Sequence, residues 1–138
     1  MRIKLKTVVE EIERANDDCM AFYDVVAERM VYLWETPFDG QENERLAEQI
    51  EETPERYLRL PMKYEIYEYR IIRDFVKALP DGAAQRELAD AIRGKGAFHR
   101  FKQGIRYHGI EKQWYEYRDH AFRELAVAWC KAQGLECE

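Results

Sequence analysis

The chain of 138 residues contains no serine and only three threonines, Thr7, Thr36 and Thr53. A serine nucleophile is therefore excluded, and the threonines stand where we expect helix caps and loops. Long apolar runs are also missing, and the longest are far shorter than the roughly 20 residues that a transmembrane helix needs. We therefore predict a protein without a membrane partner.

Cysteine and histidine are scarce as well. The three cysteines, Cys19, Cys130 and Cys137, are odd in number and widely spaced, so we expect no disulfide framework and a cytoplasmic location. Cys130 lies in an apolar helical stretch, where a small core residue is the simplest interpretation. The three histidines lack the spacing of metal ligands: His99, His108 and His120. We predict no metal and no cofactor.

Charge is unevenly distributed along the chain. The net charge is −5, yet residues 91–110 contain five Lys/Arg and no Asp/Glu. The rest of the chain contains 17 Lys/Arg and 27 Asp/Glu. Overall acidity argues against a protein that coats nucleic acid with its whole surface. A local basic surface can still act at contact range, because salt screens charges beyond about 10 Å.

The N-terminal part predicts a helix, a β-hairpin and a second short helix. Thr7 followed by Glu10 resembles a capping box, which predicts a helix over residues 7–17. Aromatic and β-branched residues predict strands over 19–26 and 30–34, joined by a turn at 27–29. A helix is expected over 42–52, and an extended segment over 57–61, before Pro61.

The C-terminal half predicts four helices, over residues 63–79, 83–93, 97–107 and 110–133. Pro80-Asp81-Gly82, Gly94-Lys95-Gly96 and Gly109 separate them. In the third helix, Phe98, Phe101 and Ile105 form the expected core stripe. The predicted fold is α+β, a mostly helical single domain over residues 1–138. Its C-terminal four-helix unit is preceded by an N-terminal helix and a small β-hairpin.

From Pro54 onward the chain resembles the bacterial uncharacterised protein family 0158. Four blocks carry the resemblance, in order over about residues 56–138: YLRLP, EIYEYRIIRDF, AIRGKGAFHRFK and WYEYRDHAFRELAVAWC, followed by a final Gly-Leu-Glu. The resemblance divides the chain into a variable part, 1–53, and a family-like part, 54–138. It supports the helical fold and implies no activity and no catalytic residue.

The Gly94-Lys95-Gly96 junction is the first candidate site. Free backbone N–H groups at a helix start, with the helix dipole, can hold an anion, and Arg93, Lys95 and Arg100 could supply charge. The junction lacks the Ser or Thr that follows the lysine of a phosphate-binding loop. A second interpretation is a helix–helix corner in which Gly94 caps one helix and Gly96 allows close approach.

The basic run itself also has two interpretations. Cations interleaved with aromatics can bind single-stranded nucleic acid by charge and stacking. Alternatively, the phenylalanines face the core and the cations form an ordinary solvated face. The candidate residues for an anion or a partner are Arg93, Gly94, Lys95, Gly96, Arg100, Lys102 and Arg106.

Three hypotheses about function follow. The leading one is a cytoplasmic, non-enzymatic binding module whose basic face, Arg93–Arg106, engages an acidic protein or a nucleic acid. The second is a small enzyme or ligand-binding protein that holds a phosphorylated or carboxylated metabolite at the Gly94–Gly96 junction. The third is a homodimer in which the basic face meets the acidic surface of another copy. No catalytic residue is nominated, which favours the non-enzymatic hypothesis.

Overall fold

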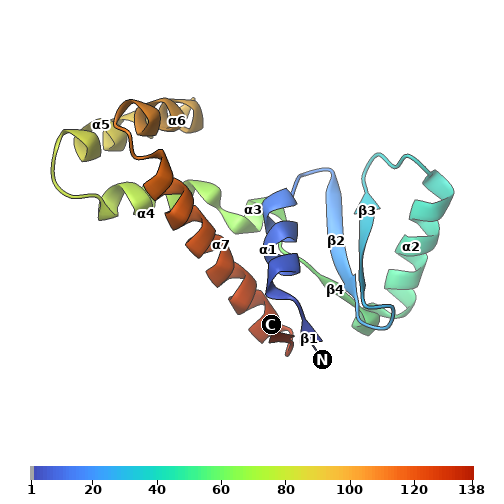
Figure 1. Ribbon diagram of the computed structural model, residues 1–138. Coiled ribbons are helices and arrows are strands. Elements are labelled where there is room, and N and C mark those ends of the chain that lie inside the picture. Colours follow the sequence, from blue (N-terminus) through green and yellow to red (C-terminus); the bar gives the residue numbers. More distant parts are fainter. Residues whose placement is uncertain (1) are drawn as a thin grey trace. The chain divides into compact units, whose positions relative to one another are not determined.

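A computed structural model describes residues 2–138 and has the mixed α+β, mostly helical fold that the sequence predicts (Figure 1). The chain divides into two compact units, one formed by residues up to Ile66 together with Phe122–Glu138, the other by Tyr67–Ala121. Helix α7 (Glu111–Ala132) contributes residues to both units. A single domain over residues 1–138 therefore stays a prediction. None of the helices in the described range is long and apolar enough to cross a membrane.

The first unit contains a three-stranded antiparallel sheet with the order β3-β2-β4. Strands β2 (Cys19–Asp24) and β3 (Arg29–Trp34) form the predicted hairpin, and β4 (Tyr57–Arg59) pairs along the other side of β2. The turn occupies residues 25–28 rather than 27–29, and Glu28 adopts a φ of +55° within it. A left-handed residue there lets a four-residue turn close without glycine.

Helix α1 (Leu5–Arg14) buries Val8 and Ile12, and Oε1 of its Glu11 accepts a hydrogen bond from the Tyr32 hydroxyl of β3 at 2.6 Å. The predicted capping box was wrong, because the helix begins two residues before Thr7 and its N-cap, Lys4, makes no side-chain hydrogen bond. Tertiary pairing sets this start instead: β1 (Arg2–Ile3) lies parallel to β5 (Glu136–Cys137), and the Leu5 N–H donates to the Glu138 carbonyl at 3.0 Å.

Helix α2 (Gly40–Glu52) begins two residues before the predicted position. Asp39 is its N-cap, and the carboxylate accepts hydrogen bonds from the N–H groups of Gln41 and Glu42 at 3.1 and 3.2 Å. Such a cap satisfies donors that would otherwise lack partners at a helix start. A short 3₁₀ turn (Pro54–Arg56) then leads into β4.

The C-terminal segment contradicts the expectation of a chain without disulfides. Cys130 and Cys137 are joined, with their Cα atoms 6.4 Å apart, while Cys19 is free. Gly134, with a φ of +72°, ends α7 and reverses the chain, which brings Cys137 back beside the last turn of the helix. Cys130 is nevertheless buried, as predicted for a core residue.

The second unit consists of α4 (Glu68–Ala78), α5 (Ala83–Ala91), α6 (Ala97–Tyr107) and the first part of α7. Phe75, Phe101 and Trp114 form the aromatic centre of its core, with ring centroids 4.8–6.1 Å apart. The predicted helix over 63–79 was wrong, because Tyr67 adopts a φ of +55° and separates α3 (Lys63–Ile66) from α4.

Candidate functional site

The junction between α5 and α6 turns at Gly94 and Gly96, whose φ angles are +73° and +77°. The predicted glycine break is therefore confirmed, since L-residues rarely adopt this conformation. Gly96 also has little room for a side chain, because an added Cβ would lie 2.9 Å from Nη1 of Arg100.

Arg100 folds back from the first turn of α6 into this junction. Its Nε donates to the carbonyl of Ala91 at 2.7 Å, its Nη2 to that of Arg93 at 2.5 Å, and its Nη1 to that of Lys95. These carbonyls belong to the end of α5 and the turn after it, where main-chain acceptors lack helical donors. One guanidinium group thus caps α5 from α6, and its donors are directed into the fold.

The buried stripe of α6 consists of Ala97, Phe101 and Ile105. Phe98, predicted to lie in the core, is 47% exposed. Ala97 takes the position one turn before Phe101, so Phe98 is rotated toward solvent. The exposed side chains of α6 are Phe98, His99, Lys102, Gln103, Arg106 and Tyr107.

The remaining cations of the predicted site have weak partners or none. Nη1 of Arg93 lies 4.0 Å from Oδ1 of Asp90, and Nε of Arg106 lies 3.9 Å from Oε1 of Glu111. Both distances are at the limit for an ion pair, and both arginine side chains are highly exposed. Exposed pairs of this kind contribute about 0–1 kcal/mol. Lys95 and Lys102 are exposed and have no carboxylate within 4 Å among residues 2–138.

These positions form one surface, called here the α6 basic face: Arg93, Lys95, Phe98, Lys102, Arg106 and Tyr107. Phe98, Lys102 and Arg106 follow one another at four-residue intervals and so lie along one side of the helix. Gly94 and Gly96 form the turn that precedes α6. The hydrogen bonds of Arg100 to main-chain carbonyls hold that turn in place. The sequence predicted the cations of this face, but it placed Phe98 in the core and offered Arg100 to an anion. In the structure Phe98 is exposed, and Arg100 donates to main-chain carbonyls at the end of α5.

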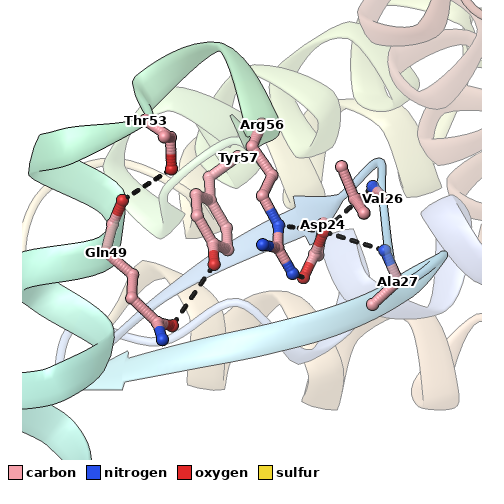
Figure 2. A network of polar contacts seen from close by, with 7 residues as sticks. All are labelled: Asp24, Val26, Ala27, Gln49, Thr53, Arg56 and Tyr57. Carbon is pink, nitrogen blue, oxygen red and sulfur yellow. Dashed lines mark hydrogen bonds and ion pairs between the residues drawn. The ribbon is translucent and has the colours of Figure 1, made fainter.

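A second polar cluster belongs to the first unit and has a structural character (Figure 2). The buried Asp24 carboxylate accepts two hydrogen bonds from Arg56, at 2.9 and 2.8 Å, and two from the N–H groups of Val26 and Ala27. Arg56, with help from the two N–H groups, lowers the pKa of Asp24 to about 2. A carboxylate held so firmly in its charged form locks the hairpin turn and is unsuited to proton transfer near neutral pH.

Cys19 offers no activated nucleophile. Burial, reinforced by the charge of Glu11, raises the pKa of its thiol, so the thiol is protonated near neutral pH. Across residues 2–138, no group of three or more His, Cys, Asp or Glu is placed to hold a metal ion. The α6 basic face therefore remains the candidate site that combines charge with exposure.

The first unit contains a groove that was not predicted from the sequence. The groove, of about 800 Å³, lies between β3 and α2, and Trp34, Phe38 and Leu46 line it. Phe38 is fully exposed, and Trp34 is 44% exposed. The only signal for it in the sequence is a phenylalanine within the polar loop 35–39, which by itself specifies no groove.

Comparison with known proteins gives one family. The model of an uncharacterised protein family, UPF0158, matches residues 1–137, and thus includes the N-terminal half that the sequence blocks did not reach. A UPF0158 protein of Pseudomonas aeruginosa is 25% identical over 88 residues, which cover 63% of this chain and 58% of that protein. No solved structure matches the chain.

Proposed function

Since this chain belongs to the uncharacterised protein family UPF0158, whose description names no activity, we propose a function from its own surface. The protein is a non-enzymatic binding module, and its α6 basic face binds single-stranded nucleic acid. The observation that carries the proposal is the exposure of Phe98 and Tyr107 beside four cations that lack strong carboxylate partners.

The charge of the second unit supports this assignment. Residues 67–121 contain eleven Lys/Arg and eight Asp/Glu, a net charge of +3, and the rest of the chain carries −8. The acidity of the whole chain therefore belongs to the first unit. A phosphate backbone that approaches α6 meets a locally positive unit, and surface charges beyond about 10 Å are screened by salt.

The exposed aromatics favour a single strand over an acidic protein surface. Phe98 is 47% exposed and Tyr107 is 82% exposed, at the two ends of α6. Bases of a single strand can stack on such rings, which contributes about 1–3 kcal/mol per base. A duplex hides its bases and would use only the cations. An acidic protein would use the cations without needing ring faces.

The test is fluorescence anisotropy with labelled single-stranded RNA and DNA, a matching duplex, and poly-glutamate as the acidic polymer. For contacts from Arg93, Lys95, Lys102 and Arg106, the logarithm of the association constant should fall with log salt at a slope of about −3 for single strands. Absence of binding to either single strand at the lowest salt contradicts the proposal. Tighter binding of poly-glutamate than of the single strands points to an acidic protein instead.

Variants then locate the surface. The triple variant Lys95→Gln/Lys102→Gln/Arg106→Gln should weaken binding at least about tenfold and make the salt slope shallower. Its matched control, Arg73→Gln/Lys77→Gln/Lys112→Gln, removes three exposed cations from the same unit outside the face. Tyr107→Ala should weaken single-strand binding by about fivefold or more while leaving the salt slope unchanged. Equal losses in the triple variant and its control would refute the location.

A further inference from the structure

The groove between β3 and α2 lies beside an open sheet edge. Strand β3 is the outer strand of the order β3-β2-β4, so only one of its two sides is paired in the sheet. Helix α2 lies beside β3 in the first unit (Figure 1). Residues of α2 line the side of the groove opposite β3. The volume of about 800 Å³ lies within the range of ligand-binding clefts.

The hydrogen bonds of Trp34 show which backbone groups point into this groove. Its N–H donates to Oδ1 of Asn43 at 2.8 Å, and its carbonyl accepts from Nδ2 of the same residue at 3.0 Å. Both main-chain groups of Trp34 therefore point away from β2 and toward α2. In an antiparallel ladder this direction alternates, so the N–H and C=O groups of Met30 and Tyr32 point the same way.

The pairing of β2 with β4 supports the same direction independently. The Leu60 N–H donates to the carbonyl of Ala21, so the main-chain groups of Ala21 point toward β4 and away from β3. Ala21 stands opposite Tyr32 in the register. In an antiparallel pair, two opposite residues either both point their main-chain groups at each other or both point them away. Since Ala21 points away from β3, the main-chain groups of Tyr32 point away from β2. Among residues 2–138, the main-chain groups of Met30 and Tyr32 have no hydrogen-bond partner on this side.

Asn43 indicates what this edge can accept. Its side-chain amide donates one N–H to Trp34 and accepts one through Oδ1, and it thus pairs with Trp34 as the peptide groups of a neighbouring strand would. One position of the edge is thus already occupied by an amide from α2. The two positions before it, Tyr32 and Met30, present the same donor–acceptor pair to the groove.

The side chains of the groove define the chemistry of an occupant. Trp34 and Phe38 give an apolar end, near the start of α2. Arg29 and Arg45 also line the groove, and neither has a carboxylate within 4 Å among the described residues. Of the acidic lining residues, Asp39 is occupied in capping α2, which leaves Glu42 near the apolar end.

We propose that this groove binds an extended, acidic segment of another protein, which adds to the edge of β3 as a further strand. Its main chain pairs with Met30 and Tyr32, its apolar side chains contact Trp34 and Phe38, and an acidic side chain faces Arg29 and Arg45. Strand addition of this kind takes affinity from main-chain hydrogen bonds and specificity from alternate side chains.

The probe is a displayed library of random linear peptides, selected on the full chain, from which the enriched sequences are synthesised. We expect them to combine apolar residues with Asp or Glu. On binding, the amides of Met30 and Tyr32 should exchange with solvent at least about tenfold more slowly, because they become hydrogen-bonded. Failure to enrich any peptide, or protection confined to residues outside 29–49, would overturn the proposal.

Two variants test the main-chain pairing. Met30→Pro removes the outward N–H and leaves the pairing with β2 intact, because proline is tolerated on edge strands. It should weaken peptide binding at least about tenfold, whereas Met30→Leu should keep it. Circular dichroism of both variants checks the fold, and retained binding by a folded Met30→Pro variant would refute strand addition.

A charge variant and the oligomeric state complete the test. Arg45→Glu should weaken acidic peptides about tenfold or more, and Arg123→Glu, an exposed arginine outside the groove, should not. If a second copy of the chain occupies the edge instead, light scattering will give a dimer that Met30→Pro converts to a monomer, and the proposal of a foreign peptide is then wrong. The α6 triple variant should bind the peptide normally, which separates this proposal from nucleic-acid binding.

Discussion

At the scale of single residues, two charged side chains are used to satisfy main-chain groups. The guanidinium of Arg100 donates to three carbonyls around the end of α5, and the carboxylate of Asp24 accepts from two N–H groups of the hairpin turn. Such bonds substitute for donors and acceptors that regular structure cannot supply at its ends. A charge seen in the sequence is therefore not always a charge available to a ligand.

The Asp24 cluster makes stability depend on pH in acid. The folded pKa of about 2 lies below the ordinary value of 3.8. Asp24 therefore contributes stability above about pH 4, which is lost as the pH falls toward 2. At 1.36 kcal/mol per pKa unit the contribution is about 2 kcal/mol. Asp24→Asn keeps a side-chain oxygen that accepts from the N–H groups of Val26 and Ala27. In urea unfolding measured between about pH 5 and 2, its free energy of unfolding should not show this acid-dependent decrease.

Asp39→Asn serves as the matched control for this prediction. Asp39 also accepts hydrogen bonds from two main-chain N–H groups, yet no arginine in the described part of the chain is bonded to it. Its variant should keep the acid-dependent loss of wild type. If Asp24→Asn shows the same dependence on pH as wild type, the carboxylate of Asp24 is not its source.

At the scale of elements, α5 and α6 approach each other closely at Gly104. A Cβ added there would lie 2.5 Å from Cδ2 of Leu88, a fully buried side chain of α5. A larger residue at this position therefore requires the Leu88 side chain or one of the helices to shift. Together with the Arg100 cap at the turn, this contact joins the two helices at both ends of α6.

Gly104→Ala should therefore destabilise the protein by about 1–3 kcal/mol, because the core must shift to admit the methyl group. Thermal unfolding followed by circular dichroism measures this as a lower Tm. In a Leu88→Ala variant, Gly104→Ala should lower the Tm by a smaller amount, because the Leu88 Cδ2 atom that meets the new methyl group is absent.

Gly82→Ala provides the control for Gly104→Ala. Gly82 precedes α5 with an extended φ of 164°, and an added Cβ meets nothing within 4 Å. Its Tm should stay unchanged or rise slightly, because alanine restricts the unfolded chain. Equal Tm values for the two alanine variants would contradict the close contact between Gly104 and Leu88.

The elements that local chemistry determines were predictable from the sequence. Helix α6 has the predicted bounds, Ala97–Tyr107, because paired glycines precede it and Gly109 follows it. The break at Tyr67 was not predictable, since no glycine or proline marks it and the left-handed φ is set by the folded chain. The start of α1 was missed for a similar reason: pairing of β1 with β5 overrides the local capping pattern.

The candidate sites divide in the same way. The cations of the α6 basic face follow from composition, because a run without carboxylates is visible in the sequence. The roles of Arg100 and Phe98 depend on the helix phase, in which Ala97 rather than Phe98 begins the buried stripe. The groove depends on Asn43 reaching Trp34, a contact between an edge strand and a helix that no local pattern encodes.

At the scale of the whole molecule, the Cys130–Cys137 disulfide fixes the segment that pairs with the N-terminal strand. Protein purified without reductant and unfolded should therefore titrate one thiol per chain, from Cys19, and three after reduction. Cys19→Ala should titrate none before reduction. Three thiols before reduction would mean that the disulfide does not form, in line with a reducing compartment.

The two units are not equivalent along the chain, and this affects the order in which they can be completed during synthesis. Every residue of the second unit has been added once Ala121 is reached, whereas the first unit still lacks Phe122, Ala126 and Trp129 of its core. The sheet strands, between residues 19 and 59, therefore lack part of the core of their unit until residues 122–138 have been added. We expect the emerging chain to acquire the helical unit first, and to expose the sheet to chaperones until residues 122–138 have been synthesised.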